Sequence, residues 1–133
     1  MADPYFCELY IDTDENIDDL KRVVDALVRE EFSDVSVSAP VYRNDNFIPS
    51  ARARVPYRFI ECSRYYAEVG TEKDDPRWLA PFQSGIVGLV KKLRKGGRFV
   101  TASCVFEDLI VAQTGWNWTR EQPEPPGRKV QLE

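Results

Sequence analysis

The most reactive side chains in this sequence belong to Cys7, Cys62 and Cys104, and the sequence contains no histidine. Without histidine, the chain cannot form a Ser-His-Asp triad, a Cys-His pair or a histidine-ligated metal centre. Cys62 stands between Arg58 and Arg64; in a strand both arginines would share its face and favour a nucleophilic thiolate. The alternative is three buried, reduced thiols. We expect this alternative, because the number of cysteines is odd and no two are close in the sequence.

Carboxylates are the second group that could carry chemistry. Glu107 and Asp108 are adjacent, so in a strand they would point to opposite faces, whereas paired-carboxylate catalysis needs both groups at one bond. Glu8, Glu61 and Glu107 could approach one another across strands and bind magnesium or calcium, but their spacing matches no metal motif. Glycine-rich phosphate loops are also absent from the sequence. We therefore expect no catalytic, metal-binding or cofactor-binding residues, and keep an enzyme that uses Cys62 or clustered carboxylates as an alternative.

The distribution of charge says more about partners than the net charge of −4. Residues 1–34 hold 11 acidic and 3 basic side chains, and the acidic ones include Asp18, Asp19 and Asp25 on one side of a predicted helix. Such a surface would attract a basic protein partner, although a solvated helix face is the simpler interpretation. Nucleic acid is not an expected partner, because phosphate contacts require positive charge.

The sequence also bears on location. The first residues, Met1 to Pro4, contain no basic region and no apolar run, so we expect no signal peptide. No stretch approaches 18 consecutive apolar residues, which argues against a membrane span. Together with the odd number of cysteines, these features predict a cytoplasmic protein without membrane contact.

The periodicity of apolar residues predicts two helices and four strands. The predicted helices cover residues 16–31 and 78–95, and each has a repeated apolar face. The predicted strands cover residues 5–11, 35–42, 56–69 and 98–106. The third of these is unusually long, so we expect a bend or a bulge in it. An apolar run at 109–112 could add one more strand.

This order of elements, β-α-β-β-α-β, is typical of a ferredoxin-like α+β sandwich. The antiparallel sheet would have its first and third strands in the centre, with both helices on one face and a short C-terminal extension. Residues 1–121 would form a single domain, and the proline-rich residues 122–133 would be extended or disordered.

The opposite face of such a sheet would be open, and we predict that a partner binds there. Phe6, Glu8 and Tyr10 alternate with the apolar positions of the first strand, so they would lie on this open face. Trp116 and Trp118 have the same parity and would project together, as aromatic hot spots do. In the alternative, the C-terminal segment covers the sheet and both tryptophans are core residues.

One segment carries a resemblance. The run Ala102-Ser103-Cys104-Val105-Phe106-Glu107-Asp108 follows a lysine-rich helix and a Gly-Gly stop. It resembles small uncharacterised bacterial proteins that carry an Ala-Cys-x-Phe-Glu-Asp run on their last main strand. Those proteins have no established activity, so no residue role is transferred. In size, acidity and lack of histidine the chain also resembles immunity proteins of polymorphic toxins.

The sequence therefore predicts a non-enzymatic binding protein, and specifically an immunity-type inhibitor that blocks a basic toxin domain through acidic and aromatic surface. A ligand-sensing or dimerising α/β module, whose open sheet face pairs with itself, is the first alternative. The small enzyme described above is the second.

Overall fold

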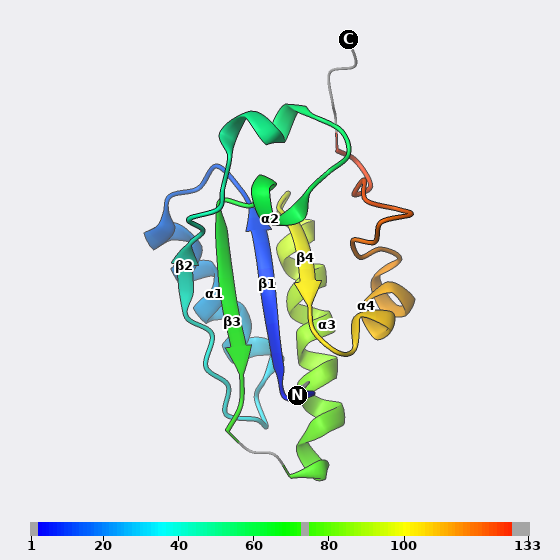
Figure 1. The fold of residues 1–133 in the computed structure, drawn as a ribbon. Helices are drawn as coiled ribbons and strands as arrows, with labels where there is room; N and C mark the ends of the chain where they lie inside the picture. The colour runs from blue at the N-terminus through cyan, green and yellow to red at the C-terminus, as the bar shows by residue number, and fades with distance from the viewer. Residues whose placement is uncertain (1–2, 73–74, 129–133) are drawn as a thin grey trace.

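The computed structural model describes residues 3–72 and 75–128, and it has the α+β architecture that the sequence predicts (Figure 1). Its strands are β1 (Phe6–Asp12), β2 (Val41–Arg43), β3 (Tyr65–Gly70) and β4 (Phe99–Ser103). Its α-helices are α1 (Ile17–Glu31), α2 (Phe59–Cys62), α3 (Leu79–Lys95) and α4 (Glu107–Thr114). Two 3-10 helices, η1 (Pro49–Ala53) and η2 (Pro76–Trp78), complete the order of elements.

The four strands form one open antiparallel sheet in the order β2-β3-β1-β4. This confirms the predicted antiparallel sheet with β1 and β3 in its centre. The full order of elements departs from the six-element ferredoxin-like pattern, because α2, α4 and the two 3-10 helices are added to it. The additional elements matter for the site, since α2 and η1 lie against the face that was expected to be open.

Helices α1 and α3 pack side by side on one face of the sheet, behind it in Figure 1. Asn16 caps α1 by accepting a hydrogen bond from the backbone N–H of Asp19, as an N-cap asparagine should. The helices bury their apolar stripes against the inward positions Cys7, Leu9 and Ile11 of β1, which are all fully buried. Gly85 lets the helices approach closely, because a Cβ there would overlap the ring of Phe32.

The opposite face is covered at one end only. Tyr57, Cys62 and Trp116 form a second, smaller apolar cluster there, with Phe59, Phe99 and Trp118 packed against it. The cluster joins the loop that contains η1 and α2 to the C-terminal segment that follows α4. Gly115, at a φ of 89°, ends α4 in the left-handed conformation and turns the chain toward this cluster.

Strand β4 is an edge strand, and side chains form hydrogen bonds with its backbone N–H and C=O groups that face away from β1. Arg94 donates to the carbonyl of Val100, and the side chain of Asn117 both accepts from the N–H of Ala102 and donates to its carbonyl. Glu107 accepts a hydrogen bond from the N–H of Cys104 just beyond the strand. These contacts satisfy an edge that would otherwise be free to pair with another strand.

Three predicted elements are corrected. The second strand is not 35–42 but only Val41–Arg43, preceded by a single bridge from Ser38 to Gly70, because Pro40 cannot donate to a ladder. The third strand begins at Tyr65 rather than at residue 56, because its first part forms α2 and not a bend. The run at 109–112 lies inside α4 rather than in an extra strand.

The C-terminal segment is irregular but packed. Between residues 122 and 128 it contains no helix or strand. The Nε1 of Trp116 donates to the carbonyl of Gln122, Glu124 accepts from the N–H of Tyr57, and Arg128 donates to the carbonyls of Arg52 and Arg54. Residues 122–128 therefore lie on the domain, and the rest of the predicted tail, 129–133, lies outside the described residues. Within the described ranges no helix is long and apolar enough to cross a membrane.

Candidate functional site

The face of the sheet opposite α1 and α3 carries a continuous row of five aromatic rings. The row runs across β2, β3 and β1 and then onto α2 and the C-terminal segment. Neighbouring ring centroids are 5.2 Å apart for Tyr42–Tyr66, 6.0 Å for Tyr66–Tyr10, 5.2 Å for Tyr10–Phe59 and 5.1 Å for Phe59–Trp118. We call Tyr42, Tyr66, Tyr10, Phe59 and Trp118 the aromatic row. Tyr42 is 41% exposed and the others are partly buried, so the row is open to a partner along its length.

The backbone places a pair of glutamates beside the row. Glu8 of β1 is directly opposite Glu68 of β3, two residues along each strand from the pair Tyr10–Tyr66. Like charges directly opposite each other destabilise a sheet, so the pair carries a cost that a bound cation would relieve. Among the outward positions of the four described strands none is basic, whereas Glu8, Glu68 and Asp12 are acidic.

Burial and the nearby carboxylates raise the pKa values of two tyrosines of the row, Tyr10 and Tyr66. Burial, followed by the hydrogen bond and the charge of Glu8, raises the pKa of Tyr10 above its usual range. Burial and the charges of Glu68 and Glu8 raise the pKa of Tyr66 in the same direction. Both tyrosines therefore stay neutral, and their ring faces stand in a negative potential that favours cations.

The far end of the row depends on the position of α2, which contacts hold from both sides. Asn44, at the end of β2, donates its amide N–H groups to the carbonyls of Ile60 and Ser63, at 2.7 and 2.8 Å. The indole N–H of Trp118 donates to the carbonyl of Tyr57 at 2.6 Å. These contacts bring Phe59 between Tyr10 and Trp118 and so make the row continuous.

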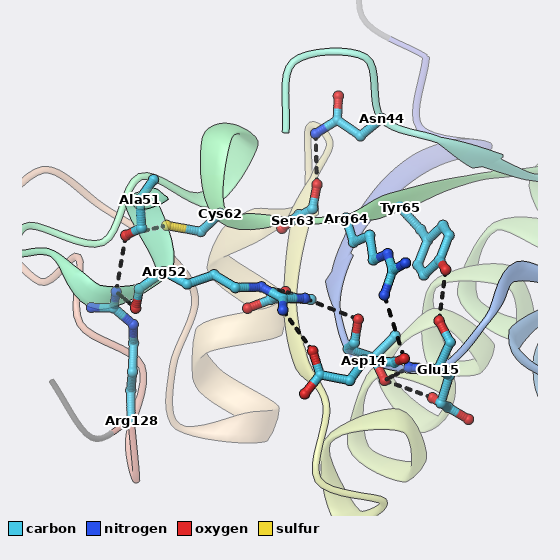
Figure 2. A network of polar contacts seen from close by, with 12 residues as sticks. Asp14, Glu15, Asn44, Ala51, Arg52, Cys62, Ser63, Arg64, Tyr65 and Arg128 are labelled. Atoms are coloured by element: carbon cyan, nitrogen blue, oxygen red, sulfur yellow. Dashed lines mark hydrogen bonds and ion pairs between the residues drawn. The ribbon is translucent and has the colours of Figure 1, made fainter. Parts of the chain in front are cut away.

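A network of polar contacts fixes the same end of the sheet (Figure 2). Arg52 of η1 donates to the carboxylates of Asp12 and Asp14, at 2.8 and 2.6 Å. The guanidinium of Arg128 lies 4.8 Å from the centre of the Tyr57 ring, and its side chain is 5% exposed. Burial is the main influence on Asp12 and raises its pKa, although Arg52 opposes the shift. Both arginines therefore make contacts within the fold that join η1 and the C-terminal segment to the end of the sheet.

Arg98 and Glu15 form a bidentate ion pair, at 2.6 and 2.8 Å, that links the start of β4 to the loop before α1. The hydrogen bond from Arg98 lowers the pKa of Glu15 below its ordinary value of 4.5. A carboxylate whose pKa is lower in the folded state contributes stability above its ordinary pKa, and that contribution is lost as the pH falls through the lowered value.

We therefore expect Glu15→Gln to lower the free energy of unfolding at neutral pH by about 1 kcal/mol or less, the usual range for partly exposed pairs. The difference from the wild-type protein should begin to shrink as the pH falls below 4.5 and disappear below the lowered pKa, where Glu15 is protonated in the folded protein as well. Urea unfolding at a series of pH values measures it. Glu121→Gln, at an exposed glutamate, is the control; a difference that grows as the pH falls would contradict the assignment.

The residues predicted to bind a partner separate into two surface groups and one buried residue, Trp116. Phe6, Glu8 and Tyr10 do lie together on the outer face of β1, and Trp118 joins them through Phe59. The exposed Asp18, Asp19 and Asp25 lie on α1, which covers the other face, and Asp19 is paired with Arg22. One flat surface of a partner would not touch both groups.

Trp116 does not lie on the exposed face of the sheet. Trp116 is only 6% exposed and belongs to the second apolar cluster. Its ring lies 5.2 Å from the guanidinium of Arg94. Burial lowers the pKa of this guanidinium from its ordinary value of 12.5 to about 10. The alternative interpretation, in which the C-terminal segment covers the sheet, holds for this residue.

Sequence reasoning missed Tyr42, Tyr66 and Phe59. The parity of Tyr66 relative to Tyr65 would have placed it outward once β3 was known to begin at Tyr65. For Phe59 no local signal exists, because its place in the row depends on the hydrogen bonds from Asn44 to α2.

The structure also corrects the arguments for chemistry at Cys62. Cys62 ends α2 and is fully buried, so Arg58 and Arg64 do not flank it on a strand face. Its thiol donates to the carbonyl of Ala51 at 3.3 Å, and burial raises its pKa. In the part of the chain that the structure covers, Glu8, Glu61 and Glu107 form no metal-binding group.

The fold and the row together define an α+β protein with an open, aromatic and acidic sheet face. Comparison with known proteins found no matching family profile, no matching curated protein and no matching solved structure.

Proposed function

We propose that this chain is a non-enzymatic binding protein whose open sheet face binds a cationic segment of a protein partner. The observation that carries the proposal is the aromatic row beside the opposed pair Glu8 and Glu68. Aromatic ring faces attract ammonium and guanidinium groups, and the carboxylates would pair with them. Flat aromatic surface of this kind also supplies the hot spots of protein interfaces.

The same charges disfavour the alternative in which two copies pair through this face. Two copies would bring both glutamate pairs together without a compensating base, since the outward strand positions described above include none. Like-charge contact across an interface costs several kcal/mol. A basic partner, in contrast, binds more tightly because its positive charges attract the same glutamates.

The binding test uses a fluorescently labelled octa-arginine peptide at low ionic strength, with an octa-glutamate peptide as the chemical control. We expect the arginine peptide alone to bind, and its affinity to fall as salt is added, because screening weakens exposed charge contacts. In the Glu8→Gln/Glu68→Gln double variant the dissociation constant should rise about tenfold or more, as loss of paired charges does.

The matched control is Asp18→Asn/Asp25→Asn, which removes the same net charge from the exposed surface of α1. This variant should bind almost as well as the wild-type protein, because its changes lie on the other side of the molecule. Equal losses in both double variants would show only a response to net charge and would contradict a site on the sheet face. A mass that rises with concentration and depends on Tyr66 would favour self-association instead.

An immunity-type role is the specific form of this proposal. A toxin domain with a basic active-site surface would present the cationic segment, and occupation by this chain would block it. Co-purification with a purified basic toxin domain, lost in the Glu8→Gln/Glu68→Gln variant and kept in the α1 variant, supports the role. A cognate toxin domain that binds both variants equally would overturn it.

A further inference from the structure

The two cysteines outside the second cluster lie near each other at one end of the β1–β4 ladder: Cys7 is in β1, Cys104 directly follows β4, and their side chains share a hydrogen bond. The register pairs Glu8 with Ser103, the last residue of β4, so the next position along each strand brings Cys7 and Cys104 to the same side of the sheet. Both thiols pack in the main apolar core, Cys7 fully buried and Cys104 partly exposed. This juxtaposition is not visible in the sequence, where the two residues stand far apart.

The hydrogen bonds at this end of β4 match those of a non-hydrogen-bonded antiparallel pair, the type in which the two Cα atoms are closer together. Both backbone groups of Ala102 bond outward to Asn117, and the carbonyl of Val100 bonds outward to Arg94. Ala102 therefore makes no ladder bonds to Leu9, and two residues further on the N–H of Cys104 likewise bonds away from β1, to the carboxylate of Glu107. Non-hydrogen-bonded pairs have Cα atoms about 4.5 Å apart, within the range that a disulfide spans.

We propose that Cys7 and Cys104 form a dithiol that a hydroperoxide oxidises to a disulfide. The Cys104 thiolate attacks one peroxide oxygen: the S–O bond forms, the O–O bond breaks, and the leaving oxygen takes a proton as water or alcohol. The Cys7 sulfur then loses its proton and attacks Cys104. The S–S bond forms, the S–O bond breaks, and the hydroxide leaves as water. The two thiols lose two electrons and the peroxide gains them.

The exposure and the pKa of each thiol indicate which cysteine attacks the peroxide and which one then forms the disulfide. Cys104 is partly exposed beside Val105, which is 52% exposed, so a peroxide can reach it, whereas Cys7 is fully buried. The hydrogen bond from the Cys7 side chain, with help from the backbone of Phe106, lowers the pKa of Cys104. The same side-chain contact and burial raise the pKa of Cys7. Cys104 is thus the attacking thiol and Cys7 the resolving one.

Trypsin separates the three cysteines, which makes the test direct in the unmodified full chain. Cleavage after lysine and arginine places Cys7 in peptide 1–21, Cys62 in peptide 59–64 and Cys104 in peptide 99–120. The reduced protein is treated with one equivalent of hydrogen peroxide, alkylated under denaturing conditions and digested without reductant. We expect peptides 1–21 and 99–120 to be joined, with the loss of two hydrogen atoms, and peptide 59–64 to be alkylated.

Variants then test the roles. In Cys7→Ala, Cys104 should gain one oxygen atom and no internal link should form; in Cys104→Ser, Cys7 should remain alkylatable. The matched control Cys62→Ser should give the same link as the wild-type protein. The wild-type peptide map needs no variant to fold, and it overturns the proposal if the three cysteines stay reduced or if the link includes Cys62. This inference does not depend on the proposed binding function.

Discussion

Replacing Trp116 by alanine is expected to lower the free energy of unfolding by about 3–5 kcal/mol, the range for large aromatic residues in a core. Trp116 is 6% exposed and packs with Tyr57 and Cys62. Its ring also covers the guanidinium of Arg94, and its indole N–H donates to the carbonyl of Gln122 at 3.1 Å. The substitution therefore creates a cavity and removes the contacts that hold the C-terminal segment. For a domain with a total stability of about 5–15 kcal/mol the loss is large.

Urea unfolding followed by circular dichroism measures this loss, because the signal does not depend on the tryptophan that is removed. Trp116→Phe is the graded control: it keeps a ring in the cluster but removes the N–H donor, so it should cost distinctly less. Val105→Ala, at a side chain that is 52% exposed, should change little. An unchanged midpoint in Trp116→Ala would mean that the tryptophan is not part of the core and would restore its place on an interface.

The elements predicted correctly are those whose signal is local. Helix α1 shows its N-cap, its acidic first turn and its apolar stripe within its own residues, and the structure places it at Ile17–Glu31. Helix α3 shows an apolar stripe and a basic last turn within its own residues, and it ends at Lys95 with Gly96 as its C-cap. Strand β1 alternates regularly, and so the outward positions of Phe6, Glu8 and Tyr10 followed from its sequence.

The elements predicted wrongly are those that other parts of the chain determine. Phe59, Ile60 and Cys62 favour a strand, yet Asn44 bonds the carbonyls of Ile60 and Ser63 and fixes this segment as α2. Helix α4 was missed because its eight residues show no amphipathic period. Tertiary contacts outweigh local preference in such short segments.

These errors explain which part of the candidate site was missed. The outward side chains of β1 belong to a regular strand and were found, whereas Phe59 and Trp118 reach the row only through α2 and the C-terminal segment. The contact between Cys7 and Cys104 likewise depends on the register of β1 and β4, which no local pattern specifies.

The second large effect is expected at Asn117, which is 3% exposed and serves the edge of the sheet. Its Oδ1 accepts from the N–H of Ala102 at 2.9 Å and its Nδ2 donates to the Ala102 carbonyl at 3.0 Å, the two bonds that a neighbouring strand would make. Leucine has a similar volume but neither group, so Asn117→Leu leaves two buried backbone groups without partners. Each unsatisfied group costs about 1–3 kcal/mol, so for two groups we expect a total loss of about 2–6 kcal/mol.

Two measurements separate this mechanism from a general loss of packing. Urea unfolding gives the total loss, for which Asn46→Leu at an exposed asparagine is the control. Hydrogen exchange in the native state should show the Ala102 amide losing protection while the amides of the central strand β3 keep theirs, because only the edge is opened. If the Ala102 amide stays protected in Asn117→Leu, the side chain is not what satisfies it. If it is exposed, β4 presents an unpaired edge, and the variant should also aggregate more readily, since an open edge strand pairs with other chains.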